Sequence, residues 1–367
     1  MGMPMNREVV ITGMGVVSPI GCDLVELVSQ VAAVRSGIRL CEPQWLQKKF
    51  PGGVVPRTFA GEFTKLELPF LDRCQQLAVV AAGEAIADAG LGNFSGHAQR
   101  AGLYYGTVIG GAETAQFGYQ QMLIEHKSAR PFAMMAMMHN AGAAQISIRH
   151  QILGPVLTYS TACASSGSAI GEAMRAVREG YLDVAVAGGA EAPLTPATFN
   201  GFDASRALAA PDKLDVARSC RPFAADRAGL VIGEGAAFIV IESAEHAQRR
   251  GVPCYAALSG YGIASDGYHI GSPKAEGEAT ALRLALADAG LVPADIGYYN
   301  AHATATRGGD AIEAKAIHLA FGEAAQALPV SSTKSLHGHL LGAASALELL
   351  ITVVAMTESF LPATAHL

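Results

Sequence analysis

One cysteine of this chain lies where a thiol could act as a nucleophile. Residues 154–159 predict a short apolar strand, and apolar residues at helical spacing up to Gly180 predict a helix after it. Cys163 falls in the turn between them, at the first residues of the helix, where unpaired N–H groups and the helix dipole favour a thiolate. Small neighbouring residues leave room for a substrate. The alternative interpretation is a small buried hydrophobic residue, as most free cysteines are.

Two of the 11 histidines lie where they could serve the same site. His302 comes just after a predicted strand at 297–300, and His339 lies at the start of a predicted helix at 340–356. One thiol and two imidazoles from three strand ends would form a combined nucleophile and acid–base site. A zinc site is the alternative, because zinc accepts such ligands, although the sequence has no close ligand pair of the usual kind.

An internal repeat indicates how these segments are positioned. Residues 285–291 nearly copy residues 85–91, two hundred positions earlier. The strand that ends at Gly260-x-Gly262 likewise echoes the strand that ends at Gly13-x-Gly15. A third glycine of a dinucleotide-binding fingerprint is missing after Gly13, so we do not expect a dinucleotide site there.

The repeat predicts two copies of one β/α unit, residues 1–250 and residues 251–367. The helix at 340–356 is then the counterpart of the helix that follows Cys163. Corresponding turns of two such halves would face each other across a pseudo-twofold axis.

The composition excludes several classes of protein. Of the 367 residues, 50% are hydrophobic and only 16% are charged, which with 41 glycines suits an α/β protein with a large core. The net charge of −6 argues against a nucleic-acid-binding protein. The six cysteines form no CxxC pair, so a disulfide framework or a structural zinc site is not expected, and a reducing, cytoplasmic location fits. We expect neither a signal peptide nor a membrane span, because no long apolar run occurs.

The residues around the three reactive side chains resemble the β-ketoacyl-acyl-carrier-protein synthases of the elongating type, across nearly the whole chain. The matching motifs are Thr161-Ala162-Cys163, Asn300-Ala301-His302, Lys334-Ser335 with Gly338-His339, Ala187-Gly188-Gly189-Ala190-Glu191, Gly229 to Gly235, Ser265-Asp266 with Tyr268-His269, and Gly342-Ala343-Ala344 with Glu348. Thiolases differ because they use a second cysteine near the C-terminus, and no cysteine follows Cys254. Chain-initiating synthases carry Asn in place of one histidine.

The resemblance implies a thiolase-like fold with five layers, αβαβα, and a decarboxylative condensation. It implies that Cys163 carries the acyl group as a thioester. His302 and His339 then polarise the carbonyl of malonyl-acyl carrier protein and assist the loss of carbon dioxide, and the enolate attacks the acyl group. No cofactor of its own is implied, because the substrates are carried on the phosphopantetheine of the acyl carrier protein.

The same resemblance implies roles for further residues. Lys334 and Glu348 support the histidines, and Arg206 helps to dock the acidic carrier protein. Residues implied to contact the phosphopantetheine arm or the acyl chain are Thr304, Thr306, Ile109, Phe132 and Met134. The family also implies a homodimer, or a heterodimer with a ketosynthase-like subunit, and we expect the methionine-rich segment 131–144 near that interface. Core filling is the alternative role for these methionines.

Three positions depart from the family pattern. His337 stands in place of a usual Thr, Ala303 in place of a usual Gly, and Ser345 in place of a usual Gly. These departures favour a specialised pathway, such as a polyketide or polyene pathway, over housekeeping fatty acid synthesis. The alternative function is a non-catalytic or weakly active partner of the chain-length-factor kind, although such proteins usually lack the nucleophile.

The second predicted half is shorter than the first. In the first half, strands at 183–187 and 236–241 follow the nucleophile helix, and the family has about forty further residues after the equivalent second helix, including an oxyanion loop. We therefore expect either a truncated record of a longer protein or a naturally shortened subunit. A shortened subunit would be poorly active alone, because it lacks an oxyanion donor worth about 3 kcal/mol.

Overall fold

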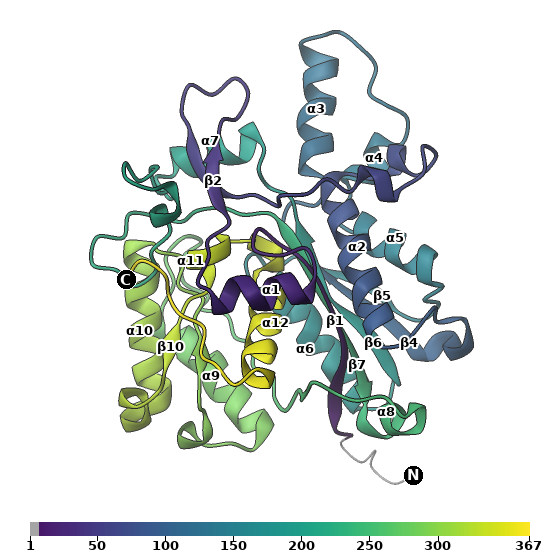
Figure 1. Cartoon of the computed structure of the whole chain (residues 1–367), viewed down its shortest axis with the longest axis vertical. Coiled ribbons are helices and arrows are strands. Elements are labelled where there is room, and N and C mark those ends of the chain that lie inside the picture. The colour runs from purple at the N-terminus through teal and green to yellow at the C-terminus, as the bar shows by residue number, and fades with distance from the viewer. Residues whose placement is uncertain (1–6) are drawn as a thin grey trace.

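The structure is a computed structural model that describes residues 7–367 (Figure 1). The strands are β1 (Val9–Val17), β2 (Ile38–Cys41), β3 (Phe50–Gly53), β4 (Ala101–Gly106), β5 (Val156–Tyr159), β6 (Val184–Glu191), β7 (Gly235–Ser243), β8 (Ala256–Ala257), β9 (Tyr299–Asn300) and β10 (Val330–Ser331). The helices are α1 (Leu24–Ala32), α2 (Arg73–Asp88), α3 (Ala112–Leu123), α4 (Ala133–Met137), α5 (Ala141–His150), α6 (Ser165–Arg178), α7 (Pro196–Ala204), α8 (Ala244–Arg250), α9 (Ala275–Ala289), α10 (Arg307–Phe321), α11 (Lys334–His337) and α12 (Ala344–Thr357).

The elements stack in five layers, as the family resemblance implies. Helices α2 and α5 cover one face of a six-stranded sheet, and α6 and α12 cover the other (Figure 1). The pair β9–β10 follows, and α9 and α10 form the outer layer. The sheet has the order β5-β4-β6-β7-β1-β8, and β6 and β7 are buried throughout, as expected for strands covered on both faces.

The internal repeat is visible in how glycines let strands approach helices. A Cβ on Gly13 would lie 2.2 Å from the Ala85 carbonyl oxygen, and a Cβ on Gly260 would lie 2.4 Å from the Ala285 oxygen. The next glycines repeat this contact one helical turn away, where a Cβ on Gly262 would lie 2.0 Å from the carbonyl oxygen of Ala281. These glycines therefore serve close packing of backbone on backbone in both halves.

The two helices that the repeat pairs, α6 and α12, meet at their N-terminal ends in the middle layer. The backbone N–H of Ala346 donates to Ser166 Oγ at 3.1 Å, and Gly167 leaves the space that the Ser345 side chain occupies. The expected meeting of corresponding turns is therefore confirmed.

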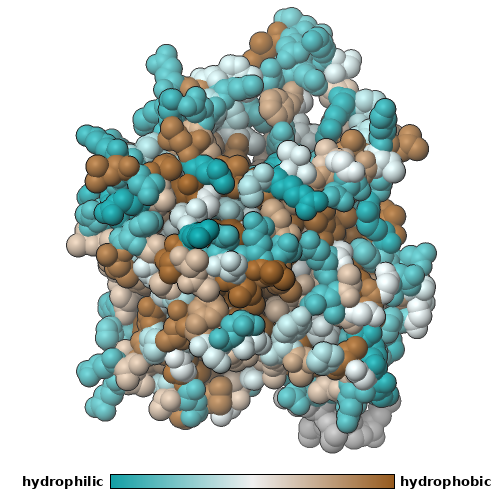
Figure 2. Space-filling model, in the orientation of Figure 1, coloured by the Kyte–Doolittle hydropathy of each residue, from teal (hydrophilic) through white to brown (hydrophobic). Residues whose placement is uncertain are grey.

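The second sheet is small in the part of the chain that the structure describes. There β9 pairs with β10 in parallel and with no other strand. Figure 2 shows hydrophobic residues gathered in the middle of the drawn face, around the position of α1 and α12 in Figure 1. Val25 of α1 is 82% exposed. No helix within residues 7–367 is both long and apolar enough to cross a membrane.

Candidate active site

Cys163 lies in a tight turn between β5 and α6. The Thr161 N–H donates to Ser165 Oγ at 2.9 Å, and the Ser165 hydroxyl donates to the Ala162 carbonyl at 2.6 Å. Ala162 has a φ of 51°, a left-handed conformation that a residue with a side chain adopts only when its surroundings impose it. The helix begins at Ser165, so Cys163 precedes it instead of lying in its first turn as predicted.

His339 contacts the thiol directly. Its Nε2 lies 2.9 Å from Cys163 Sγ, although the two residues are 176 positions apart. The His339 backbone N–H donates to the Val231 carbonyl at 2.6 Å, and its carbonyl accepts from the Gly233 N–H at 2.9 Å. His339 is therefore held as an extended residue beside the segment before β7, and not at the start of α12 as predicted, because α12 begins only at Ala344.

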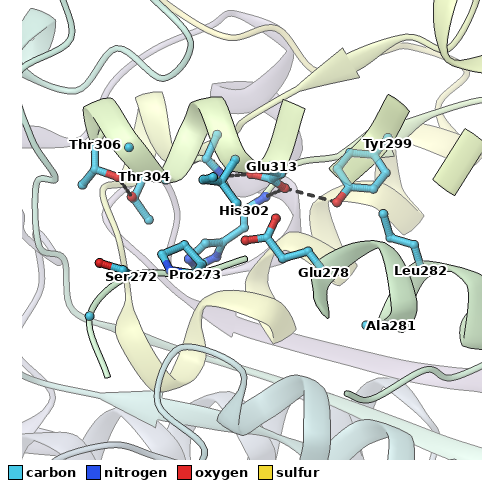
Figure 3. Close-up of a pocket in the computed structure, with 15 residues that line it drawn as sticks. Ser272, Pro273, Glu278, Ala281, Leu282, Tyr299, His302, Thr304, Thr306 and Glu313 are labelled. Atoms are coloured by element: carbon cyan, nitrogen blue, oxygen red, sulfur yellow. Dashed lines mark hydrogen bonds between the residues drawn. The ribbon is translucent and has the colours of Figure 1, made fainter. Parts of the chain in front are cut away.

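His302 completes the group from the end of β9. Its ring meets the His339 ring edge to face, with centroids 5.1 Å apart and an interplanar angle of 84°. The backbone N–H groups of His302 and Ala303 donate to the Glu313 carboxylate of α10 at 2.7 and 2.6 Å (Figure 3). The carboxylate also accepts the Tyr299 hydroxyl at 3.1 Å. Glu313 therefore fixes the loop from which the His302 ring projects.

A buried ion pair lies behind the histidines. Lys334 of α11 is fully buried, and its ammonium is in close contact with the carboxylate of Glu348 on α12. The same ammonium lies 3.4 Å from Nδ1 of His302. The predicted association of Lys334 and Glu348 with the histidines thus has a direct geometric basis.

The Cys163 thiol and the His339 ring are both shifted toward their neutral forms. Burial raises the pKa of Cys163 above its ordinary value of 9.0, against the lowering effects of the Lys334 charge and of its own backbone N–H. The backbone N–H acts in the direction predicted for the helix end, but desolvation of the half-buried sulfur outweighs it. Burial, and then the Lys334 charge, hold the pKa of His339 well below its usual range. The contact therefore joins a thiol and a neutral imidazole at neutral pH.

Desolvation and, after it, the Lys334 charge also lower the pKa of His302. The His302 ring is exposed to the adjoining cavity, so water that reaches it limits the size of that shift. The lowered pKa of His302 still favours a neutral ring at neutral pH.

Two adjoining cavities open at the site. One, of about 810 Å³, is lined by His302, Thr304 and Thr306, whose hydroxyl oxygens lie 3.1 Å apart (Figure 3). The other, of about 730 Å³, is lined by Cys163, and both cavities share Glu278. The structure therefore places Thr304 and Thr306 in the same cavity as His302.

The four residues predicted to contact the acyl chain or the carrier protein, apart from the two threonines, do not line either cavity in the described chain. Ile109 packs in a separate cluster around Phe199 and Leu341, and Arg206 is exposed just after α7. Phe132 and Met134 are 48% and 70% exposed at α4. Their expected contacts with an acyl chain therefore stay a prediction.

Two buried carboxylates were not assigned a role from the sequence. Glu313 holds the His302 loop as described above. Glu191, at the end of β6, accepts the backbone N–H groups of Val108, Ile109 and Gly342 at 2.7, 3.0 and 3.1 Å. Glu191 was part of a matched motif, whereas Glu313 had only the weak signal of an acidic residue within an otherwise amphipathic helix.

Comparison with known proteins agrees with this geometry. The 3-oxoacyl-[acyl-carrier-protein] synthase 2 of Staphylococcus aureus (strain COL) is 40% identical over 99% of this chain and 89% of its own length. Nodulation protein E of Rhizobium meliloti is 39% identical over 99% of this chain and 89% of its own length. The crystal structure of a β-ketoacyl synthase from Burkholderia phymatum STM815 matches with a TM-score of 0.88 and 35% identity, over 98% of this chain and 89% of that one. The ishigamide ketosynthase/chain length factor matches with a TM-score of 0.90 and 32% identity, over 98% of this chain and 88% of that one.

These structural matches confirm the thiolase-like fold. The family description "Beta-ketoacyl synthase, N-terminal domain" fits residues 6–247, and "Beta-ketoacyl synthase, C-terminal domain" fits residues 255–367. The chain therefore belongs to the β-ketoacyl synthase family.

Proposed function

We propose that this protein is a β-ketoacyl-acyl-carrier-protein synthase that condenses malonyl-acyl carrier protein with an acyl chain held on Cys163. The observation that carries the proposal is the cluster of Cys163, His302 and His339, backed by the buried Lys334–Glu348 pair. A thiol in contact with a neutral imidazole, beside a second imidazole and open cavities, fits acyl transfer followed by carbanion chemistry.

Acyl transfer begins with the thiol. His339 takes the proton as Cys163 Sγ attacks the thioester carbonyl, and passes it to the departing carrier thiolate. The 2.9 Å contact between Sγ and Nε2 and the lowered pKa of His339, which keeps its ring neutral, support this role. The helix dipole then contributes less to the activation of the Cys163 thiol than His339 does.

Decarboxylation follows when malonyl-acyl carrier protein enters. His302 polarises its thioester carbonyl through Nε2–H, and His339 does so after its imidazole proton moves from Nδ1 to Nε2. The C–C bond to the carboxylate breaks, and carbon dioxide leaves. The electron pair forms an enolate that attacks the acyl carbonyl and releases Cys163. Hydrogen bonds to the enolate oxygen in a desolvated site are the principal source of stabilisation.

The substrates arrive on phosphopantetheine, so the enzyme needs no cofactor of its own. Thr304 and Thr306 contact this arm, because they line the cavity that leads to His302. Exposed Arg206 contributes to docking of the acidic carrier protein. We place the protein in the cytoplasm, where free cysteines stay reduced.

The working form is a dimer, with a second copy or with a related ketosynthase-like subunit. Structures of relatives include a ketosynthase in complex with its chain length factor, from Xenorhabdus doucetiae. In this chain β5 is an outer strand whose Val156 and Leu157 are 36% and 44% exposed, and α3 projects from the body beside α4 (Figure 1). Pairing through β5 would cover this edge and place a second subunit over Phe132 and Met134.

Sedimentation tests the dimer. Leu157→Lys should convert a dimer to a monomer at micromolar concentration, whereas Val25→Lys, at another exposed apolar position, should leave it intact. A wild-type monomer at that concentration would contradict this part of the proposal.

Intact-mass analysis with a panel of acyl carrier proteins tests the enzymatic function. Wild-type protein should gain one acyl group, and peptide mapping should locate it on Cys163. Cys163→Ser should gain none, while Cys254→Ser, at an exposed cysteine, should acylate normally. Failure to acylate with every carrier would favour the chain-length-factor alternative.

Separating the two half-reactions tests the histidine roles. His302→Ala should still acylate but should lose roughly 100-fold or more in malonyl decarboxylation, the scale expected for a positioned acid, base or oxyanion donor. Normal decarboxylation by this variant would remove the assignment.

A further inference from the structure

The thiol and the two imidazoles also form a set of ligands that a transition metal could use. One ligand atom from each of Cys163, His302 and His339 lies within 4.8 Å of the others. Zinc sites in proteins commonly use such sulfur and nitrogen ligands. A condensing enzyme with this cluster would be blocked by a metal bound to its nucleophile.

The surroundings of His302 are the reverse of those in a metal site. A metal-bound histidine almost always donates its other ring N–H to a carboxylate, a carbonyl or a water. Here Nδ1 of His302 faces the Lys334 ammonium at 3.4 Å. An ammonium group has three donors and no acceptor, so this contact favours the tautomer in which Nδ1 accepts and Nε2 carries the proton. A protonated Nε2 cannot bind a metal.

Lys334 cannot swing away from this position. Its side chain is fully buried, and it is paired with the Glu348 carboxylate in close contact. Moving the ammonium would leave two buried charges uncompensated, which is strongly unfavourable.

His339 gives a metal no support either. The residue is 2% exposed, and Nδ1 has no hydrogen-bond partner among the residues the structure describes. Neither imidazole therefore has the acceptor that normally raises the basicity of a ligating histidine.

We propose that Lys334 is a positioning residue that keeps zinc and similar metal ions off the nucleophile, by holding His302 in the tautomer with its proton on Nε2. The same proton makes His302 a hydrogen-bond donor to the substrate carbonyl. One buried cation thus selects carbanion chemistry over metal binding in a cluster that could serve either. The inference extends the proposed function but rests on the hydrogen-bond geometry alone.

Cobalt binding tests the proposal, because Co²⁺ bound to a thiolate gives a charge-transfer absorption band. In Lys334→Met the ammonium that opposes a proton on His302 Nδ1 is gone, so the ring is free to place its proton on Nδ1 and leave Nε2 open to a metal. We expect this variant to bind Co²⁺ at least about 10-fold more tightly than wild type, the lower end of the effect that outer-shell contacts have on metal affinity. The band should vanish in the double variant Lys334→Met/Cys163→Ser. Equal affinity in wild type and Lys334→Met would overturn the proposal, as would tight Cys163-dependent Co²⁺ binding by wild type.

A second measurement does not depend on the folding of the variant. Nitrogen-15 NMR of histidine-labelled wild type, with His302 assigned from the signal lost in His302→Ala, reads the tautomer directly. A protonated Nε2 and a bare Nδ1 are expected, and a proton on Nδ1 would overturn the proposal. A protein that passes both metal tests yet fails to condense substrates would refute only the proposed function.

Discussion

Replacing Glu313 by Gln isolates the contribution of one buried carboxylate to the His302 loop. Oε1 accepts the His302 N–H and the Tyr299 hydroxyl, and Oε2 accepts the Ala303 N–H. Glutamine keeps the volume and one oxygen, but its amide NH2 must face one of these donors. The side chain is 5% exposed, so solvent gives little compensation.

The magnitude follows from the bonds that are lost. One charge-assisted hydrogen bond disappears and one buried N–H is left facing another donor, which should cost about 1.5–3 kcal/mol in the free energy of unfolding. A shift of the His302 loop by about 1 Å should lower decarboxylation by up to about 100-fold. Acylation of Cys163 should be unchanged, because His339 is held by other segments.

Urea unfolding and the two half-reactions, measured separately, check this prediction. The matched control is Glu276→Gln on α9, an exposed carboxylate 3.5 Å from Lys315, which should change stability by less than about 0.5 kcal/mol. Parallel losses of acylation and decarboxylation would refute the loop argument, as would unchanged stability together with unchanged decarboxylation.

Two further predictions follow from the geometry. Because burial raises the pKa of Cys163 above 9.0, its alkylation by iodoacetamide should keep accelerating as the pH rises through 9, and a plateau already reached at neutral pH would show that the thiolate is favoured after all. Gly262→Ala should destabilise the fold by about 1–3 kcal/mol in a thermal or urea melt, because its Cβ would lie 2.0 Å from the Ala281 oxygen. The control is Gly92→Ala, where a Cβ would meet nothing within 4 Å, and equal effects of the two changes would contradict the packing argument.

The reactive residues could be found from the sequence because their signals are local. Cys163 is marked by a strand, a turn of small residues and a helix, and all three are present at nearly the predicted residues. The repeat could also be read directly, because close strand–helix packing demands glycine at fixed positions in each half, such as Gly13 and Gly260. Periodicity and turn chemistry depend on neighbours in the chain, so one sequence is enough to predict them.

The chemistry of the site was decided by contacts between distant segments. The pKa of Cys163 is set by how deeply the turn is buried, and desolvation depends on elements that pack against it from elsewhere in the chain. The anchoring of the His302 loop by Glu313 is likewise a tertiary contact, between a loop and a helix. Nothing in the order of residues reveals that the Lys334 ammonium faces Nδ1 of His302, which can only accept a hydrogen bond from it. The sequence by itself determined which side chains could react, whereas only the folded structure determined where their protons lie, because proton positions depend on the few ångströms between groups far apart in the chain.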